Sequence, residues 1–272
     1  MDIELPQFFM TYARSRPRTI VPIAENLGAG LMENGLHRWS ENTEQFNKMW
    51  EYNCPHAIDS GGFNCMSKFG EFPWSVDEYH TWLSENKDKF DFAAIMDYAC
   101  EDRFNDLYTV GQRRRKTLQN TLKQFNMDPE YDLIPVLQGR SLDDYIEFYD
   151  WLNEYGLPTE FVGVGTVCRL SSTEEVVKII NGLREKTDIK YFHGFGIKVD
   201  SFKRGALFDT ADSQAWVYSA SNGERLVWNN DQSALQTVHD DDSKRRTVES
   251  FVRYYMHVQR LQNEVFENRW DI

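Results

Sequence analysis

Six positions in this sequence follow short apolar runs and carry polar side chains or turns that could do chemistry. In a parallel α/β barrel the carboxyl ends of the strands form the active-site face, so we expect these positions to converge on one mouth. A polar residue that closes a strand also commonly caps or turns the chain, so the set is more informative than any one member. The positions are Asp59, Asp97, Gln138, the turn Gly163-Val164-Gly165, the pair His193-Gly194, and Asp212.

Part of this set matches the hydrogen-bonding edge of guanine. Guanine presents N1–H and N2–H₂ donors beside an O6 acceptor, so a carboxylate can accept from the base while an amide or a backbone N–H donates to it. Asp97, Gln138 and the Gly163–Gly165 turn supply those groups. Phe63 and Phe195 are candidates for flat walls against which such a base could stack, with a place in the core as the alternative for each.

Asp59 and Asp212 then remain as a pair of carboxylates. Two carboxylates are the usual equipment for chemistry at an anomeric carbon, where one attacks C1′ and the other moves a proton on the leaving or entering group. Asp59 opens the segment Asp59-Ser60-Gly61-Gly62, and we expect the two glycines to clear space so that Asp59 can face a bound base. The pair therefore predicts glycosyl transfer, in which exchange replaces hydrolysis if water is kept out.

The charge of the chain limits how it could bind nucleic acid. A formal net charge of −13 over 272 residues argues against indiscriminate adhesion, but two basic islands remain, at residues 113–116 and 244–246. We expect the first island, Arg113-Arg114-Arg115-Lys116, to contact phosphates, with a solvated helix face as the alternative. Four scattered cysteines without a C-x-x-C pair indicate neither a disulfide framework nor a zinc site.

The elements that must position these residues alternate along the chain. S-x-x-E capping boxes at Ser75 and Ser172 predict helix starts, and apolar residues at helical spacing predict a long helix over about 244–269. Strands alternating with helices favour one (β/α)8 TIM-type barrel domain over residues 1–272, with a doubly wound open sheet as the alternative. The eighth strand is expected within 7–13 or 35–39. The seven clearer strand runs are 19–24, 56–59, 90–97, 131–138, 159–165, 189–196 and 206–212.

Several motifs, in order and over most of the chain, resemble the tRNA-guanine transglycosylase superfamily. The sequence is most similar to its DNA-acting branch, the deazapurine DNA modification transglycosylases called DpdA, found in phages, archaeal viruses and bacterial modification islands. The motifs are "DSGGF" (59–63), "IMD" (95–97), "VLQGR" (136–140), "VGVGTVCR" (162–169), "HGFG" (193–196) and "TADSQAW" (210–216).

The resemblance implies a (β/α)8 barrel that exchanges guanine in a nucleic acid for a 7-deazaguanine such as preQ0, without a cofactor. It implies that Asp212 is the nucleophile, with Asp209 in "FDTADS" as the alternative, and that Asp59 is the general acid/base. The partner is DNA, or alternatively tRNA. The implied base-binding residues are Ser60, Gly61, Gly62, Phe63, Asp97, Gln138, Gly139, Gly163, Val164, Gly165, His193 and Gly194.

Other readings stay open beside this one. No metal is expected, because the C-x-C-x₂-C zinc motif of the tRNA enzymes would need cysteines after Cys168, and none follows. A retaining glycosidase or a nucleoside deoxyribosyltransferase would also use two carboxylates, and a nucleic-acid-binding barrel without turnover would keep the fold alone. The chain begins without signal-peptide features and contains no apolar run of spanning length, so we expect a cytoplasmic protein with no membrane partner.

Overall fold

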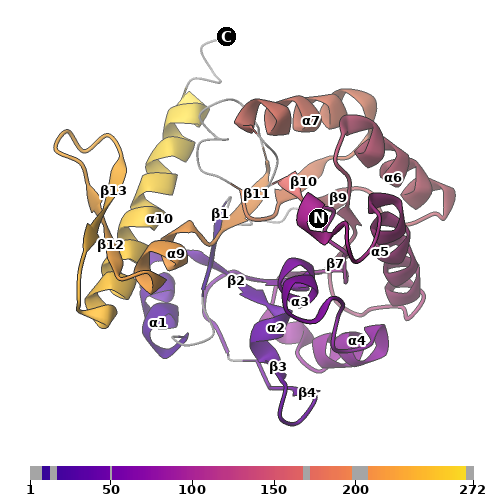
Figure 1. Ribbon diagram of the computed structural model, residues 1–272, viewed down its shortest axis with the longest axis horizontal. Helices are drawn as coiled ribbons and strands as arrows, with labels where there is room; N and C mark the ends of the chain where they lie inside the picture. The colour runs from indigo at the N-terminus through magenta and orange to yellow at the C-terminus, as the bar shows by residue number, and fades with distance from the viewer. Residues whose placement is uncertain (1–7, 13–16, 50, 168–171, 198–207, 268–272) are drawn as a thin grey trace.

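A parallel β-sheet curls around the centre of the molecule (Figure 1). The structure is a computed structural model that describes residues 8–12, 17–49, 51–167, 172–197 and 208–267. The strands of the sheet lie in the order β7-β6-β5-β2-β1-β11-β10-β9-β8. In chain order they are β1 (Phe8–Thr11), β2 (Gly30–Asn34), β5 (His56–Asp59), β6 (Phe92–Ala94), β7 (Leu133–Ile134), β8 (Val136–Leu137), β9 (Phe161–Val164), β10 (Tyr191–Gly194) and β11 (Thr210–Ser213).

The two end strands of this sheet are halves of one interrupted strand. Only Pro135 separates β7, which pairs with β6, from β8, which pairs with β9. Proline has no backbone N–H, so it breaks a ladder at its own position while the chain continues. Counted as one strand, residues 133–137 close the sheet into an eight-stranded parallel barrel, which confirms the predicted fold.

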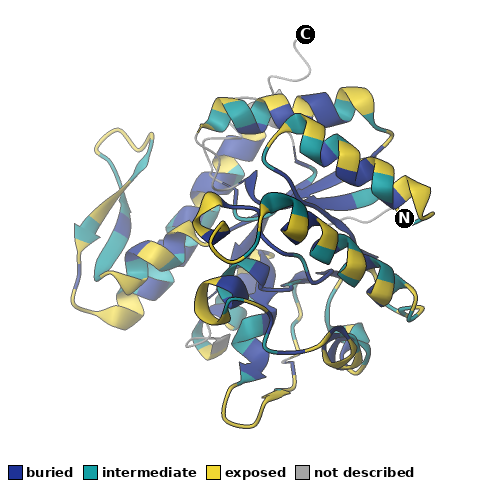
Figure 2. Cartoon of the chain, turned by 45° about the vertical axis from the view of Figure 1, so that its right-hand side comes forward, coloured by how far each residue is buried: buried dark blue, intermediate teal, exposed yellow. Residues whose placement is uncertain are grey.

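Helices surround the barrel with their apolar faces turned inward, and Figure 2 shows buried strands beneath helices that are exposed only on their outer sides. The two predicted starts are present, because Ser75 forms a capping box and the side chain of Ser172 caps the helix that follows it; Ser141 forms a further capping box. The helices are α1 (Pro17–Leu27), α2 (Gly35–Arg38), α3 (Gly62–Phe69), α4 (Val76–Ser84), α5 (Val110–Phe125), α6 (Leu142–Glu154), α7 (Thr173–Lys186), α9 (Ala215–Ser221) and α10 (Ser243–Glu267), with short 3₁₀ turns η1 (Lys87–Lys89) and η2 (Asp102–Phe104).

One strand prediction is wrong, and one strand was not predicted. The run 19–24 lies in helix α1, where Ile20 and Ala24 are buried one helical turn apart, so its β-branched residues pack on a helix face. The strand that completes the barrel on this side is β2, which the sequence reading missed. The eighth strand expected within 7–13 is confirmed as β1, whereas residues 35–38 form α2.

Alternate residues of each strand face either the barrel interior or the helices. On β11, Thr210 and Asp212 hydrogen-bond inside the barrel, while Ala211 packs in the outer core and Ser213 accepts from Tyr254 of α10. This alternation decides which polar residues meet at the centre.

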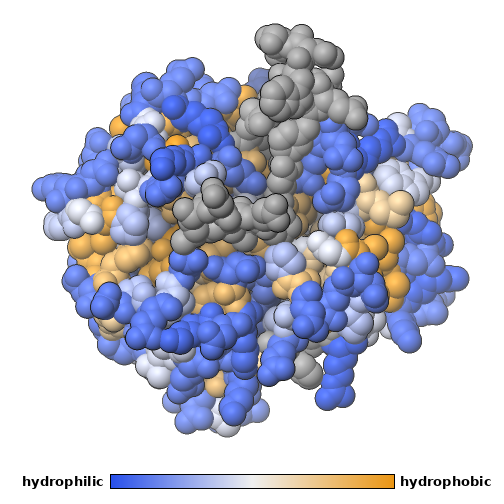
Figure 3. Space-filling view, turned by 180° about the vertical axis from the view of Figure 1, so that it is seen from behind, coloured by the Kyte–Doolittle hydropathy of each residue, from blue (hydrophilic) through white to orange (hydrophobic). Residues whose placement is uncertain are grey.

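The long C-terminal helix α10 packs beside β1 and carries a hairpin of β12 (Glu224–Trp228) and β13 (Leu235–His239) on its outer side (Figure 1). A second small hairpin joins β3 (Trp39–Ser40) to β4 (Gln45–Phe46). Seen from behind, hydrophilic side chains cover much of the surface around scattered apolar ones (Figure 3). In the part of the chain that the structure describes, no helix is both long and apolar enough to span a bilayer.

Candidate active site

The carboxylate of Asp212 lies inside the barrel and is almost fully buried. Thr11 at the end of β1 donates its hydroxyl to Oδ2 at 2.7 Å, and the backbone N–H of Gly196 donates to Oδ1 at 2.7 Å. Beneath it lies His193, whose Nε2 is 3.6 Å from Oδ1 and whose Nδ1 is 2.8 Å from the hydroxyl of Thr210. These contacts hold the carboxylate in one orientation.

Asp59 ends β5 at the same end of the barrel and is partly exposed there. The side-chain amide of Asn34 donates to Oδ2 at 2.7 Å, and the backbone N–H of Gly61 donates to Oδ1 at 3.1 Å. Desolvation by the surrounding protein raises the pKa of Asp59 to about 7, and the negative charges of Asp97 and Asp212 add to the rise against these two hydrogen bonds. Asp59 therefore exchanges its proton near neutral pH.

Asp97 follows β6 and is held by two side chains. Ser60 donates to its Oδ1 at 2.8 Å and the amide of Gln138 donates to its Oδ2 at 2.5 Å. Burial raises the pKa of Asp97, and the two hydrogen bonds oppose that rise. Gln138 in turn accepts from the hydroxyl of Thr166 at 2.7 Å, and that hydroxyl oxygen accepts from the N–H of Cys100 at 2.8 Å. The chain of bonds fixes the amide with its nitrogen toward Asp97.

The glycines of the site allow neighbouring protein groups to approach closely, and they do not border open space. A Cβ at Gly62 would lie 2.0 Å from the carbonyl oxygen of Asp97, and one at Gly165 would lie 2.1 Å from Nε2 of Gln138. Gly61 has φ +84°, and a Cβ there would lie 2.4 Å from Oδ1 of Asn34. The expectation that Gly61 and Gly62 clear the space before Asp59 is therefore incomplete, since they let Asn34 and Asp97 approach.

Other candidate base-binding residues lie at different depths. Val164 and Gly194 face the outer core, where Gly194 adjoins Phe208, so only their backbone groups could meet a ligand. Gly163 lies under the ring of Phe195, and Gly139 lies against Asp144 at the start of α6. His193 is fully buried, with its ring centre 4.5 Å from that of Phe195.

Phe63 lies in the first turn of α3 and is partly exposed, with its ring edge-to-face against Phe104 at 5.5 Å between centres. Cys168 and Arg169, the end of the "VGVGTVCR" motif, lie outside the described residues. Among the residues that are described, no group of three or more His, Cys, Asp or Glu side chains is arranged to hold a metal ion.

Asp209 faces away from this site. It precedes β11, and its Oδ2 accepts from Nη2 of Arg184 on α7 at 2.8 Å and from the N–H of Phe192 at 2.7 Å. Residues three apart on an extended strand point to opposite faces, so Asp209 and Asp212 cannot occupy the same site. In this geometry Asp212, and not Asp209, faces Asp59.

Half of the first basic island is interior, which corrects the expectation of a phosphate-binding surface for Arg113 and Arg114. Arg113 is fully buried and donates to Asn105 at 2.9 Å. Arg114 is also buried; it donates to Glu147 at 2.7 Å and to Asp144 at 3.3 Å, and its guanidinium lies over the ring of Trp151. Lys116 lies over two tyrosine rings, and Arg115 is exposed.

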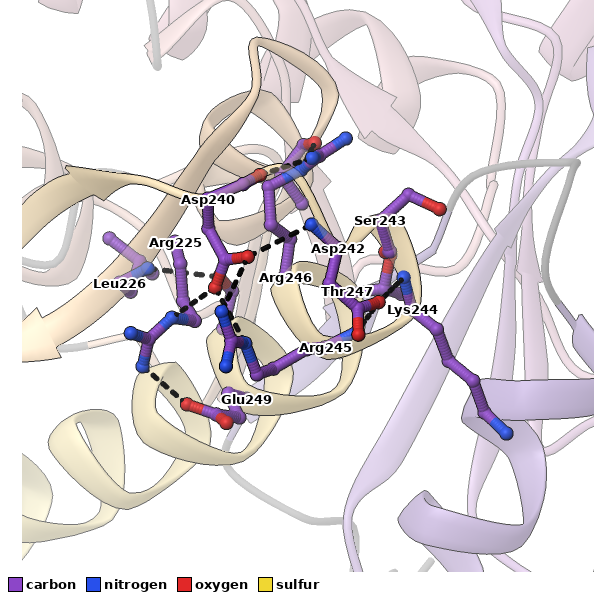
Figure 4. A network of polar contacts seen from close by, with 12 residues as sticks. Arg225, Leu226, Asp240, Asp242, Ser243, Lys244, Arg245, Arg246, Thr247 and Glu249 are labelled. Carbon is purple, nitrogen blue, oxygen red and sulfur yellow. Dashed lines mark hydrogen bonds and ion pairs between the residues drawn. The ribbon is translucent and has the colours of Figure 1, made fainter.

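In the second basic island, Arg245 is paired with Asp240, which also pairs with Arg225 (Figure 4). Arg245 donates to both carboxylate oxygens at 2.8 and 2.9 Å, and Arg225 donates to Oδ2 at 2.7 Å. These bonds, with Arg245 first, hold the pKa of Asp240 well below its ordinary value. Arg246 donates to the carbonyl oxygen of Asp240 and of Ala220, so the island joins α10 to its hairpin.

The sequence reading missed three polar residues that complete the site: Thr11, Asn34 and Thr166. Thr11 and Asn34 end β1 and β2, so the rule that a polar residue follows an apolar strand run would have found them had those runs been assigned. Thr166 has φ +66°, a conformation that no residue pattern announces.

Comparison with known protein families identifies a match over most of the chain. The family model for DpdA, DeoxyPurine in DNA protein A, matches residues 46–262, which include Asp59, Asp97, Gln138 and Asp212. The resemblance drawn from the motifs is thereby confirmed. No curated protein sequence matches the chain significantly.

Proposed function

The chain belongs to the DpdA family, and from this premise we propose that it is a DNA-guanine transglycosylase that exchanges guanine in DNA for a 7-deazaguanine of the preQ0 type. The observation that carries the proposal is the convergence of Asp59, Asp97 and Asp212 in one barrel mouth, where Asp212 accepts hydrogen bonds from Thr11 and Gly196 and the pKa of Asp59 is raised to about 7. Two carboxylates in such unlike environments are suited to unlike roles.

In the proposed reaction the target guanosine is flipped out of the stack and its base edge is held by Asp97, Gln138 and the Gly163–Gly165 turn. Asp212 attacks C1′ with a carboxylate oxygen, and the C1′–N9 bond breaks. Protonated Asp59 gives its proton to the departing guanine. The product of this half-reaction is a covalent aspartyl-deoxyribose.

The second half-reaction runs the same steps backward with a different base. Asp59, now ionised, takes the N9 proton of the incoming 7-deazaguanine while N9 attacks C1′ and Asp212 leaves. Two inversions give net retention. Guanine and 7-deazaguanines differ at position 7 and share the edge that Asp97 and Gln138 would read, so one pocket serves both bases.

Labelled guanine distinguishes this function from the alternatives. The protein is incubated with labelled guanine and either duplex DNA or tRNA, and incorporation is measured, with preQ0 incorporation followed by nucleoside mass analysis. We expect label in DNA. Label entering only tRNA would reassign the substrate, and exchange on free nucleosides would indicate a deoxyribosyltransferase.

Asp212→Asn is expected to abolish incorporation and the trapped covalent adduct. Asp209→Asn is the matched control, because Asp209 lies three residues away and points outward to Arg184. DNA binding without any incorporation by the wild-type protein would favour a binding barrel without turnover.

A further inference from the structure

The loop after β6 holds an arginine that has no carboxylate partner within the described residues. Arg103 lies exposed in the short turn η2, with its guanidinium carbon 5.3 Å from the ring centre of Phe63 and 5.4 Å from that of Phe104. The neighbouring carboxylate, Asp102, pairs instead with Arg140 at 2.8 Å. The positive charge of Arg103 is therefore held in place by two aromatic rings and is not neutralised by an ion pair.

This charge lies beside the candidate site. Phe63 immediately follows Gly62, and Gly62 packs directly against the carbonyl of Asp97. Arg103 is thus one aromatic ring away from the residues that would hold the base edge. In a nucleotide the sugar joins the base to the phosphates. A nucleotide whose base is bound beside Phe63 therefore brings its own phosphates close to Arg103.

The chemistry of the side chain suits a phosphate. A guanidinium that lies over an aromatic ring keeps its N–H donors in its own plane, where they remain free to bind phosphate oxygens in a bidentate manner. Of the other arginines considered for this task, Arg113 and Arg114 are buried and Arg245 is paired with Asp240. Arg115 is exposed but does not lie over an aromatic ring of the site in the described contacts. With a net charge of −13, the chain depends on such local cations to approach a polyanion.

We propose that Arg103 binds the DNA backbone phosphate next to the flipped guanosine. The proposal rests on the function proposed above and adds the residue that anchors the backbone at the mouth. Because it concerns a phosphate, it predicts an effect on affinity and its salt dependence that is the same for every target sequence.

Binding of a fluorescein-labelled, guanine-containing oligonucleotide, single-stranded and duplex, is titrated at several salt concentrations. The logarithm of the affinity falls linearly with the logarithm of the salt concentration, and each lost phosphate contact makes that slope shallower by about 0.9 for duplex DNA and about 0.7 for a single strand. We expect this change, with a several-fold loss of affinity at low salt, in Arg103→Ala. Arg103→Lys keeps the charge and is expected to restore the slope.

Lys186→Ala is the matched control, because it removes one exposed positive charge from the last turn of α7, at the opposite end of the barrel. Its salt slope is expected to equal that of the wild type, and thermal unfolding of each variant checks that the fold is kept. Equal slopes for Arg103→Ala and Lys186→Ala, with wild-type protein that still exchanges guanine in DNA, would overturn the role of Arg103 alone. Absence of both exchange and salt-dependent DNA binding in the wild type would overturn the proposed function as well.

Discussion

Replacing Asp59 by asparagine is expected to stabilise the protein at alkaline pH and to leave its stability unchanged at acidic pH. Asparagine is nearly isosteric with the protonated carboxyl group and carries no charge at any pH. The wild-type carboxyl has a pKa of about 7 in the folded protein, against an ordinary value of 3.8. The folded state therefore holds a proton that the unfolded chain releases.

The sign follows from the order of the two pKa values. A group whose pKa is higher in the folded state than in the unfolded state costs stability as pH rises from the unfolded to the folded value, here from 3.8 to about 7. At 1.36 kcal/mol for each pKa unit, the full cost is about 4 kcal/mol above pH 7. Asp59→Asn removes that cost, so the gain in the free energy of unfolding grows from near zero at low pH to about 4 kcal/mol.

Denaturant unfolding of the wild type and of Asp59→Asn across this pH range measures the gain directly. Asp209→Asn serves as the control, because this variant weakens the ion pair with Arg184 and is expected to lose stability at neutral pH. A difference between wild type and Asp59→Asn that does not change with pH would refute the reasoning, because it would mean that Asp59 is not desolvated in the folded protein.

Four further changes test the site. We expect the rate of single-turnover guanine release to fall as pH rises through about 7, where Asp59 loses its proton. Asn34→Ala removes a hydrogen bond that lowers the pKa of Asp59, so this fall should move to higher pH. An unchanged pH profile would mean that another group causes the fall. Thr11→Val removes a hydrogen-bond donor to Asp212 and should slow guanine release by about tenfold or more without weakening DNA binding. Measuring the single-turnover rate and the DNA dissociation constant of the same variant checks this. Gly62→Ala should lower stability by about 1–3 kcal/mol in thermal unfolding, because its Cβ would meet a backbone oxygen; an unchanged melting temperature would contradict the packing. Arg114→Ala removes the ion pairs of a buried guanidinium and should lower the free energy of unfolding by about 3 kcal/mol, while the salt slope of DNA binding stays the same. A shallower slope would mean that Arg114 contacts DNA.

Much of the site could be predicted because its residues obey a local rule. Asp59, Asp97, Gln138 and Asp212 each follow an apolar run, and the parallel topology brings the ends of those runs to one mouth. Asn34 was not predicted because Glu33 lies within β2, so residues 30–34 do not form an apolar run. Arg38 pairs with the buried Glu33 at 2.5 Å and Tyr52 donates to its Oε2, and a local pattern does not reveal those partners.

The same limit explains the basic island. Four consecutive cationic residues on a helix resemble a surface patch, but the helical repeat of α5 turns Arg113 and Arg114 inward. Whether an inward arginine is tolerated depends on acceptors from elsewhere in the chain, such as Glu147 on α6 and the carbonyl oxygen of Gln138. Those acceptors become neighbours only after folding.

The hydrogen bond between Thr11 and Asp212 joins residues 201 positions apart in the chain. A nascent polypeptide on the ribosome would hold Thr11 long before its partner strand is synthesised, and contacts of such high sequence separation form late in folding. The carboxylate of Asp212 is then oriented by Thr11 only when the ring of strands has been completed. Incompletely folded chains would consequently lack the oriented carboxylate of Asp212.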